Sequence, residues 1–126
     1  MLEILIQQLS EELGMEKPTA IQPGHYQMEF SSKVAVDLFQ QSETLLLKGE
    51  ICAIDLRTKP SFVERLMQSN LFGSGTRGGV IGWEPIKNRL TLSLELSYNC
   101  PYKLFAEKLE DFVSVIVFWR AESTQI

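Results

Sequence analysis

The chain has 126 residues, of which 44% are hydrophobic and 22% charged, and its formal net charge is -4. This composition predicts one globular domain over residues 1–126, with enough chain to bury a core without a disulfide or a metal. The basic residues are scattered, which argues against nucleic acid as a partner, and the longest apolar run, 112–119, is far shorter than the ~20 residues that membrane insertion requires.

The first half of the chain begins with a pattern typical of a helix. Apolar residues recur at helical spacing over residues 2–13, and Gly14 follows at the position expected for a helix C-cap. Three stretches with strand-like composition come next, and the short turns between them predict an antiparallel meander. Gly49 interrupts the third stretch, which predicts a β-bulge at that residue. The three stretches span residues 26–30, 34–39 and 44–54.

The second half begins with Pro60, which stands where the first residue of a helix is favoured, and an apolar helix face extends to Leu71. A glycine-rich loop at 73–79 then leads into two predicted strands, 80–83 and 89–96. Beyond Pro101 a last helix extends to Trp119, although its apolar end, 112–119, is also compatible with a strand. This helix is expected to direct inward Leu104, Phe105, Leu109, Phe112, Val113, Ile116 and Trp119, with Val115 away from that stripe.

The predicted order of elements is α, β, β, β, α, β, β, α. This order, with short connections and one strongly alternating strand at 89–96, favours an α+β fold. We therefore predict a largely antiparallel, twisted sheet with the helices packed against it.

The sequence offers no constellation of catalytic or metal-binding residues. The glycine-rich loop formally matches G-x-G-x-x-G, but it follows a helix and enters a strand, the reverse of the context in which that motif binds a dinucleotide. His25 is the only histidine, which excludes a metal cluster built on histidines within one chain. Cys52 and Cys100 lack metal-ligand spacing and are expected to be reduced thiols in a cytosolic protein. We therefore expect no enzyme activity, no metal and no cofactor.

In pattern the chain resembles the class I type III secretion chaperones, the CesT/SycE-like family of Gram-negative bacteria. The resemblance covers nearly the whole chain and rests on four passages: the end of the second helix at 66–73, the passage 78–83, the leucine-alternating strand 90–96 and the last helix ending on Phe112 and Trp119. It implies a cytoplasmic dimer that binds the N-terminal segment of a secreted effector, keeps it non-globular and soluble, and delivers it to the secretion apparatus without hydrolysing nucleotide.

The resemblance also implies two surfaces. The second helix and the neighbouring strand would form the dimer interface, with Phe62, Val63, Leu66, Met67, Leu71, Phe72, Leu92 and Leu94. The first helix and the first three strands would bind the effector as an extended segment paired with a sheet edge. The residues expected in that site are Leu5, Ile6, Leu9, Val34, Val36, Leu38, Leu45 and Leu47.

Three alternatives stay open at this point. The protein could be half of a heterodimer of two chaperone chains, because some relatives assemble in that way. It could bind a small anionic ligand through the glycine-rich loop and Arg77. It could also be a regulatory protein that sequesters a transcription or export component through the same hydrophobic surface.

Overall fold

The computed structural model describes residues 2–30, 33–73 and 75–124, apart from the side chain of Phe72. Within these residues the predicted order of elements is confirmed, with one short 3-10 helix, Leu56–Thr58, added before the second α-helix. The α-helices are α1 (Leu2–Leu13), α2 (Pro60–Phe72) and α3 (Tyr102–Ser123). The strands are β1 (His25–Phe30), β2 (Val34–Gln40), β3 (Thr44–Ala53), β4 (Val80–Glu84) and β5 (Arg89–Ser97).

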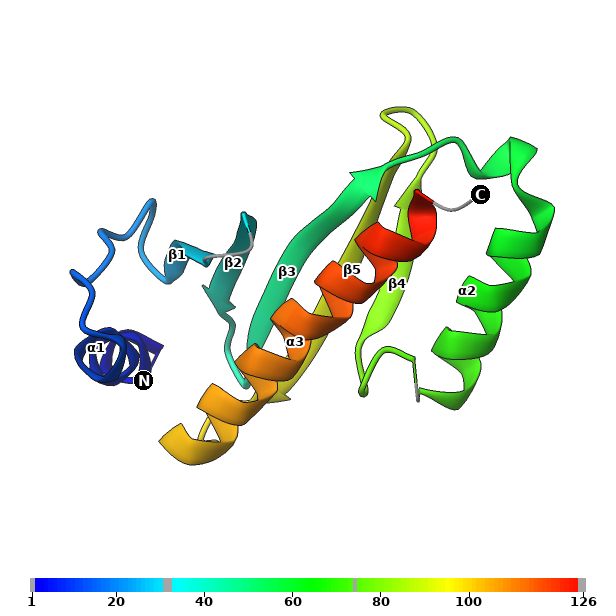
Figure 1. The fold of residues 1–126 in the computed structure, drawn as a ribbon. Helices are drawn as coiled ribbons and strands as arrows, with labels where there is room; N and C mark the ends of the chain where they lie inside the picture. Colours follow the sequence, from blue (N-terminus) through cyan, green and yellow to red (C-terminus); the bar gives the residue numbers. More distant parts are fainter. Residues whose placement is uncertain (1, 31–32, 74, 125–126) are drawn as a thin grey trace.

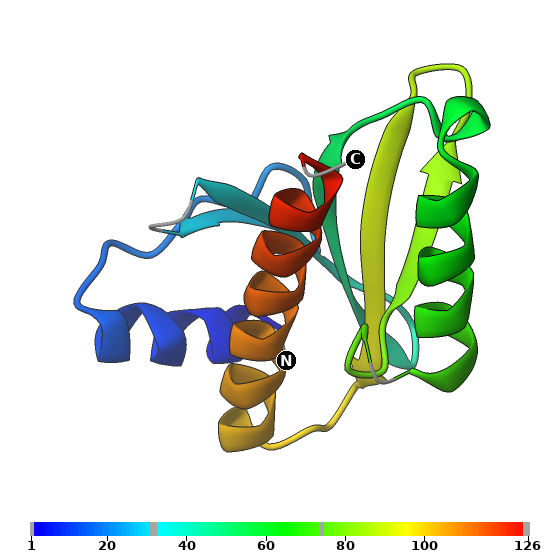
Figure 2. The same cartoon turned by 45° about the vertical axis from the view of Figure 1, so that its right-hand side comes forward.

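The five strands form one antiparallel sheet in the order β1-β2-β3-β5-β4. Alternate residues of every strand are buried on the face that carries the helices, while polar side chains such as Gln27, Lys48 and Glu50 occupy the other face. α3 lies across the middle of the sheet, with α1 on one side of it and α2 on the other (Figures 1 and 2). The fold is therefore a two-layer α+β arrangement with one solvated sheet face.

The end of α1 follows the prediction. Gly14 has a left-handed backbone with φ of 66°, and the Met15 N–H donates to the Ser10 carbonyl at 3.0 Å. These features satisfy the last carbonyls of the helix and turn the chain away from its axis.

The predicted β-bulge at Gly49 is wrong in position. The register between β3 and β5 shifts between Glu50 and Cys52, so the extra residue is Ile51, two positions beyond Gly49. Gly49 instead lies where α3 comes closest to the sheet: a Cβ added there would be 2.6 Å from Ile116 Cδ1 and 3.2 Å from Phe112 Cε1. The glycine is therefore required for contact between helix and strand rather than for a break in the ladder.

The shifted register leaves backbone carbonyls that Arg120 of α3 satisfies. Its guanidinium donates to the carbonyl oxygens of Ile51 at 2.7 Å, Glu50 at 3.0 Å and Lys33 at 3.2 Å. One side chain thus joins the end of α3 to the irregular part of β3 and to the β1–β2 turn. The bond to Ile51 is half-buried, and leaving that carbonyl unpaired would cost free energy, whereas the bonds to Glu50 and Lys33 are exposed.

The apolar C-terminal end of α3 is helical, so the alternative of a strand over 112–119 is wrong, and the helix extends to Ser123. Two assignments of faces on this helix also need correction. Leu104, expected inward, lies in the first turn of the helix and is 41% exposed, whereas Val115, expected away from the stripe, is buried at 5%. Val113, also expected inward, is half-buried, so the fully buried stripe is narrower than predicted; α3 packs on β3, β2, β5 and α1.

Candidate functional site

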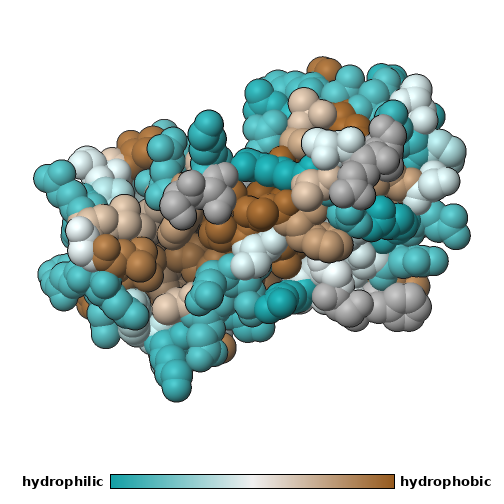
Figure 3. All heavy atoms as spheres, viewed as in Figure 1, coloured by the Kyte–Doolittle hydropathy of each residue, from teal (hydrophilic) through white to brown (hydrophobic). Residues whose placement is uncertain are grey.

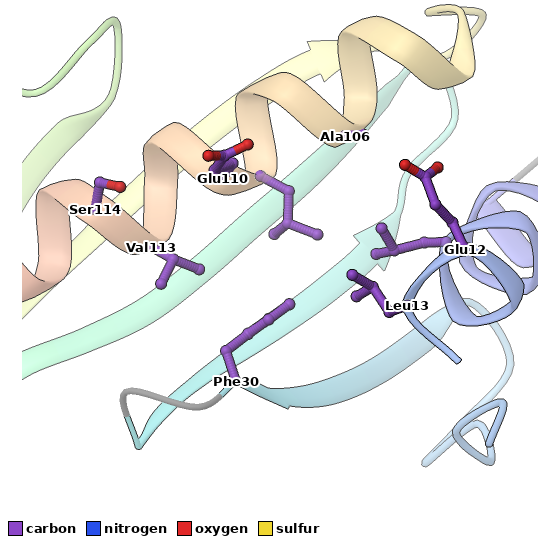
Figure 4. A pocket seen from close by; sticks show the side chains of 9 residues that line it. Glu12, Leu13, Phe30, Ala106, Glu110, Val113 and Ser114 are labelled. Carbon is purple, nitrogen blue, oxygen red and sulfur yellow. The ribbon is translucent and has the colours of Figure 1, made fainter. Parts of the chain in front are cut away.

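A groove separates α1 from α3 on the helical side of the sheet. Figure 3 shows hydrophobic side chains gathered in this hollow, which has a volume of about 300 Å³. Leu13 and Phe30 reach into it from α1 and from the end of β1, and Val113 faces them from α3 (Figure 4). We call this the α1–α3 groove; it is lined by Leu9, Glu12, Leu13, Phe30, Ala106, Leu109, Glu110, Val113 and Ser114.

The two carboxylates of the groove differ in their surroundings. Glu12 accepts a hydrogen bond from the Tyr102 hydroxyl, and burial together with this carboxylate raises the pKa of Tyr102 to about 12. The tyrosine therefore stays protonated at neutral pH and can hold Glu12 in place. Glu110 is exposed and forms no ion pair with any residue that the structure describes. An apolar hollow thus carries negative charge on its rim.

One edge of the sheet, that of β1, is open beside this groove. The Gln40 N–H donates to the Gly24 carbonyl at 2.7 Å, and the alternation of an antiparallel ladder then directs the backbone groups of Gln27 and Glu29 away from β2. Within residues 2–30, 33–73 and 75–124, no hydrogen bond occupies these outward groups. Such an edge is a template for an additional strand.

The opposite edge, that of β4, is capped by α2 at Ile81. The side-chain amide of Asn70 accepts from the Ile81 N–H and donates to the Ile81 carbonyl, both at 2.8 Å. The amide thereby makes the pair of hydrogen bonds that a neighbouring strand would make. The two edges of the sheet are chemically different for this reason.

The helix that caps this edge has two apolar sides. Phe62 and Leu66 are buried, and Phe62 contacts Trp119 edge to face with ring centroids 5.8 Å apart. Met67 and Leu71 point outward and are 65% and 78% exposed. Together with Pro60 and the half-buried Val63 they line a shallow groove, which we call the outer face of α2. An unpartnered apolar helix face of this kind is typical of an interaction surface.

The residues predicted for the dimer interface therefore separate into two sets. Val63, Met67 and Leu71 lie on the outer face of α2, and Leu94 is half-buried on β5. Phe62, Leu66 and Leu92 belong to the core of the protomer. Phe72 has its side chain outside the part of the chain that the structure describes.

The residues predicted to bind the effector all lie in the hydrophobic core. They are at most 6% exposed, so their side chains support the surface residues and are not themselves accessible to a client. They are Leu5, Ile6, Leu9, Val34, Val36, Leu38, Leu45 and Leu47, and only Leu9 among them also lines the α1–α3 groove. The sequence analysis missed the accessible residues of this groove, Phe30 and Glu110 among them, because neither periodicity nor composition shows which apolar positions stay uncovered.

The glycine-rich loop is tied to the rest of the fold. The Trp119 indole N–H donates to the Gly75 carbonyl at 3.0 Å, and the Arg77 guanidinium pairs with Asp111 at 2.7 Å. Because the charge of Arg77 is already balanced, the loop is a poor anion site. His25 pairs with Asp37 at 2.9 Å and stacks on Phe39.

The described residues include no cluster of three or more histidine, cysteine or acidic side chains that could hold a metal ion. The same part of the chain contains no helix long and apolar enough to cross a membrane. An open sheet edge and apolar surfaces dominate instead, and these are features that bind polypeptides.

Solved structures with this fold include type III secretion chaperones in complex with their partners. The ExsC–ExsE complex superimposes with a TM-score of 0.78 at 16% identity, covering 95% of this chain and 91% of that chain. The chaperone–effector complex HopA1–SchA gives 0.76 at 16% identity, covering 95% and 93%. The Yersinia pestis type III secretion chaperone SycH, in complex with a fragment of YscM2, gives 0.74 at 17% identity, covering 94% and 98%.

Sequence comparison agrees with the structural likeness. The chain belongs to the Tir chaperone protein (CesT) family, which matches over residues 4–120. It is thus a type III secretion chaperone and not an enzyme, as the sequence pattern predicted. A comparison with functionally curated proteins found no significant match.

Proposed function

We propose that this chaperone binds the N-terminal segment of a secreted effector in the cytoplasm of a Gram-negative bacterium, keeps it extended and soluble, and delivers it to the secretion apparatus. The observation that supports this most directly is the open β1 edge next to the α1–α3 groove. Family membership and the likeness to chaperone complexes support the same function.

In this mechanism the effector segment adds a strand to the sheet. Its backbone bonds to the outward groups of Gln27 and Glu29, which gives affinity for many sequences, while its side chains enter the α1–α3 groove, which selects among them. While it is paired with β1, the segment cannot fold together with the rest of the effector, so it stays extended. Binding of this kind requires no chemical step.

The client can be identified by affinity capture of the tagged protein from its own bacterium, followed by mass spectrometry. We expect a secreted polypeptide whose N-terminal segment is sufficient for binding. A client that is not secreted, or that binds through another region, would contradict the proposal and favour a regulatory protein that sequesters its partner.

Gln27→Pro is expected to weaken binding of the captured client at least about tenfold, since one edge hydrogen bond and its geometry are lost. The N–H of Gln27 points away from β2, so proline removes a donor to the client without breaking the ladder of the sheet. Gln27→Ala is the matched control, because it removes the side chain and keeps the N–H. Calorimetric titration measures both variants, and equal affinities would exclude strand addition at β1.

For assembly, we propose that the outer face of α2 pairs two chaperone chains. Met67 and Leu71 are highly exposed, and they adjoin Val63 and Pro60 on one helical stripe. In a homodimer a second copy of this chain would cover the outer face of α2. In a heterodimer a different chaperone chain with a complementary helix would cover it.

The double variant Met67→Glu, Leu71→Glu is expected to shift the purified protein from a dimer to a single species of 14.3 kDa. Two charges buried in an apolar interface carry a large desolvation cost, and the weakening should exceed about a hundredfold. Leu104→Glu is the control, because Leu104 is also exposed but lies on α3. Light scattering measures the mass; a wild-type protein that is already monomeric without a second chain would contradict the homodimer.

A further inference from the structure

The groove between α1 and α3 combines two features that the fold does not require. Leu13 is 53% exposed at its edge although it continues the buried stripe of α1. Glu110, on the same rim, has no cation paired with it within the described residues. By contrast Asp111, its neighbour on the helix, pairs with Arg77 at 2.7 Å. The unpaired charge therefore lies on the groove side of α3.

The second rim carboxylate is held toward the same space. Glu12 is fixed by the Tyr102 hydroxyl, which contributes a neutral donor and leaves the negative charge of the carboxylate in place. Figure 4 shows Glu12 on α1 and Glu110 on α3, on opposite sides of the groove that Leu13, Phe30 and Val113 also line. A ligand that fills this groove meets an apolar floor and two anionic walls.

Phe30 connects the groove to the open sheet edge. It is the last residue of β1, directly after Glu29, whose backbone groups point outward. A strand paired with β1 at Glu29 therefore passes the groove with its next residues. Side chains of such a strand alternate between the two faces, so every second one can turn toward the helices.

We propose that the α1–α3 groove selects client segments in which an arginine or lysine stands two residues from an aliphatic side chain, so that both side chains turn to the same face of the strand. The aliphatic side chain occupies the hollow between Leu13, Phe30 and Val113. The cation two residues away turns to the same face of the strand and lies near the carboxylates of Glu12 and Glu110. This selection rests on the proposed strand addition at β1, and it adds a rule about which effector segments the chaperone accepts.

The test uses three labelled peptides of about twelve residues, long enough to form one strand and to pass the groove. Isoleucine alternates with threonine in all three, and two isoleucines, each two residues from an isoleucine that is kept, are replaced by arginine, glutamine or glutamate, so that the replaced side chains share the face of the remaining isoleucines. We expect the arginine peptide to bind about tenfold more tightly than the glutamate peptide at low salt, with the glutamine peptide between them. Fluorescence anisotropy at several salt concentrations gives the affinities.

The double variant Glu12→Gln, Glu110→Gln should remove this preference and flatten the salt dependence while retaining binding of the glutamine peptide. The amide oxygen that replaces the Glu12 carboxylate still accepts the hydrogen bond from Tyr102, so the groove keeps its shape. Glu107→Gln is the matched control, because Glu107 is an exposed acid of α3 that does not line the groove. The Glu107→Gln variant should prefer the arginine peptide over the glutamate peptide as strongly as the wild type does.

The outcomes separate this inference from the proposed function. Equal binding of all three peptides would overturn the charge selection and leave strand addition intact, whereas no binding of any peptide would count against both. Leu13→Gln should weaken binding of the glutamine peptide. Because the replaced positions of this peptide carry no charge, the change reports on the apolar hollow alone. If Glu110→Lys changes the mass of the free protein, a second copy occupies the groove and the proposal is wrong.

Discussion

Gly49→Ala is expected to lower the free energy of unfolding by about 1 to 3 kcal/mol, the usual cost of overpacking a core. The new methyl group would lie 2.6 Å from Ile116 Cδ1, 3.2 Å from Phe112 Cε1 and 3.4 Å from the Ala35 carbonyl oxygen. Ile116 and Phe112 are at most 2% exposed, so neither can swing into solvent. α3 would have to lift from β3, and a larger residue such as valine should prevent folding at physiological temperature.

Gly82→Ala is the matched control for this prediction. Gly82 is also in a strand, but the nearest atom to an added Cβ is Thr91 Oγ1 at 3.9 Å. The variant should be neutral or more stable by up to about 1 kcal/mol, because alanine restricts the unfolded chain. Urea unfolding of both proteins at one concentration gives the comparison, and equal stabilities would show that α3 is not seated against Gly49.

The second large effect is expected at Arg120. Arg120→Ala should cost about 2 to 4 kcal/mol, since a hydrogen bond to a charged group contributes about 1.5 to 3 kcal/mol and the carbonyls of Ile51 and Glu50 lose their donor. Arg120→Lys should recover only part of the loss, because an ammonium group cannot reproduce the planar fork of donors.

Arg89→Ala provides the reference for removing an arginine at the surface. Arg89 is 3.9 Å from Glu50, its side chain is 53% exposed, and such pairs contribute less than about 1 kcal/mol. Thermal and urea unfolding should therefore rank the variants in the order wild type, Arg89→Ala, Arg120→Lys, Arg120→Ala. An Arg120→Ala protein as stable as Arg89→Ala would show that water replaces the guanidinium without loss.

Much of this fold could be predicted from the sequence because its patterns are local. The alternating leucines at 90–96 and the helical stripe over 2–13 each depend on one burial face, and both elements form where expected. Contacts between distant elements could not be predicted in this way. The reason for a glycine at position 49 is its contact with α3, the last helix of the chain. Because that contact is distant in sequence, the local pattern predicts a bulge instead.

The site was less accessible to sequence analysis than the fold. The pattern on α2 assigns Phe62, Leu66 and Met67 to one apolar face, yet the helix turns the first two inward against the core and leaves the third exposed. Helical periodicity gives the width of an apolar stripe and not which part of it a neighbouring element covers. For the same reason nothing in the sequence pattern distinguishes the groove residues Phe30 and Val113 from residues of the core.

The unequal sheet edges also limit how far such molecules can associate. A protein with two free strand edges can add copies at both ends, and nothing stops the resulting fibril from growing. Here the Asn70 amide occupies the backbone of Ile81, so a strand cannot pair with β4 at that residue. Two copies that pair through their β1 edges would therefore present β4 edges that are blocked at Ile81, which hinders the addition of further copies.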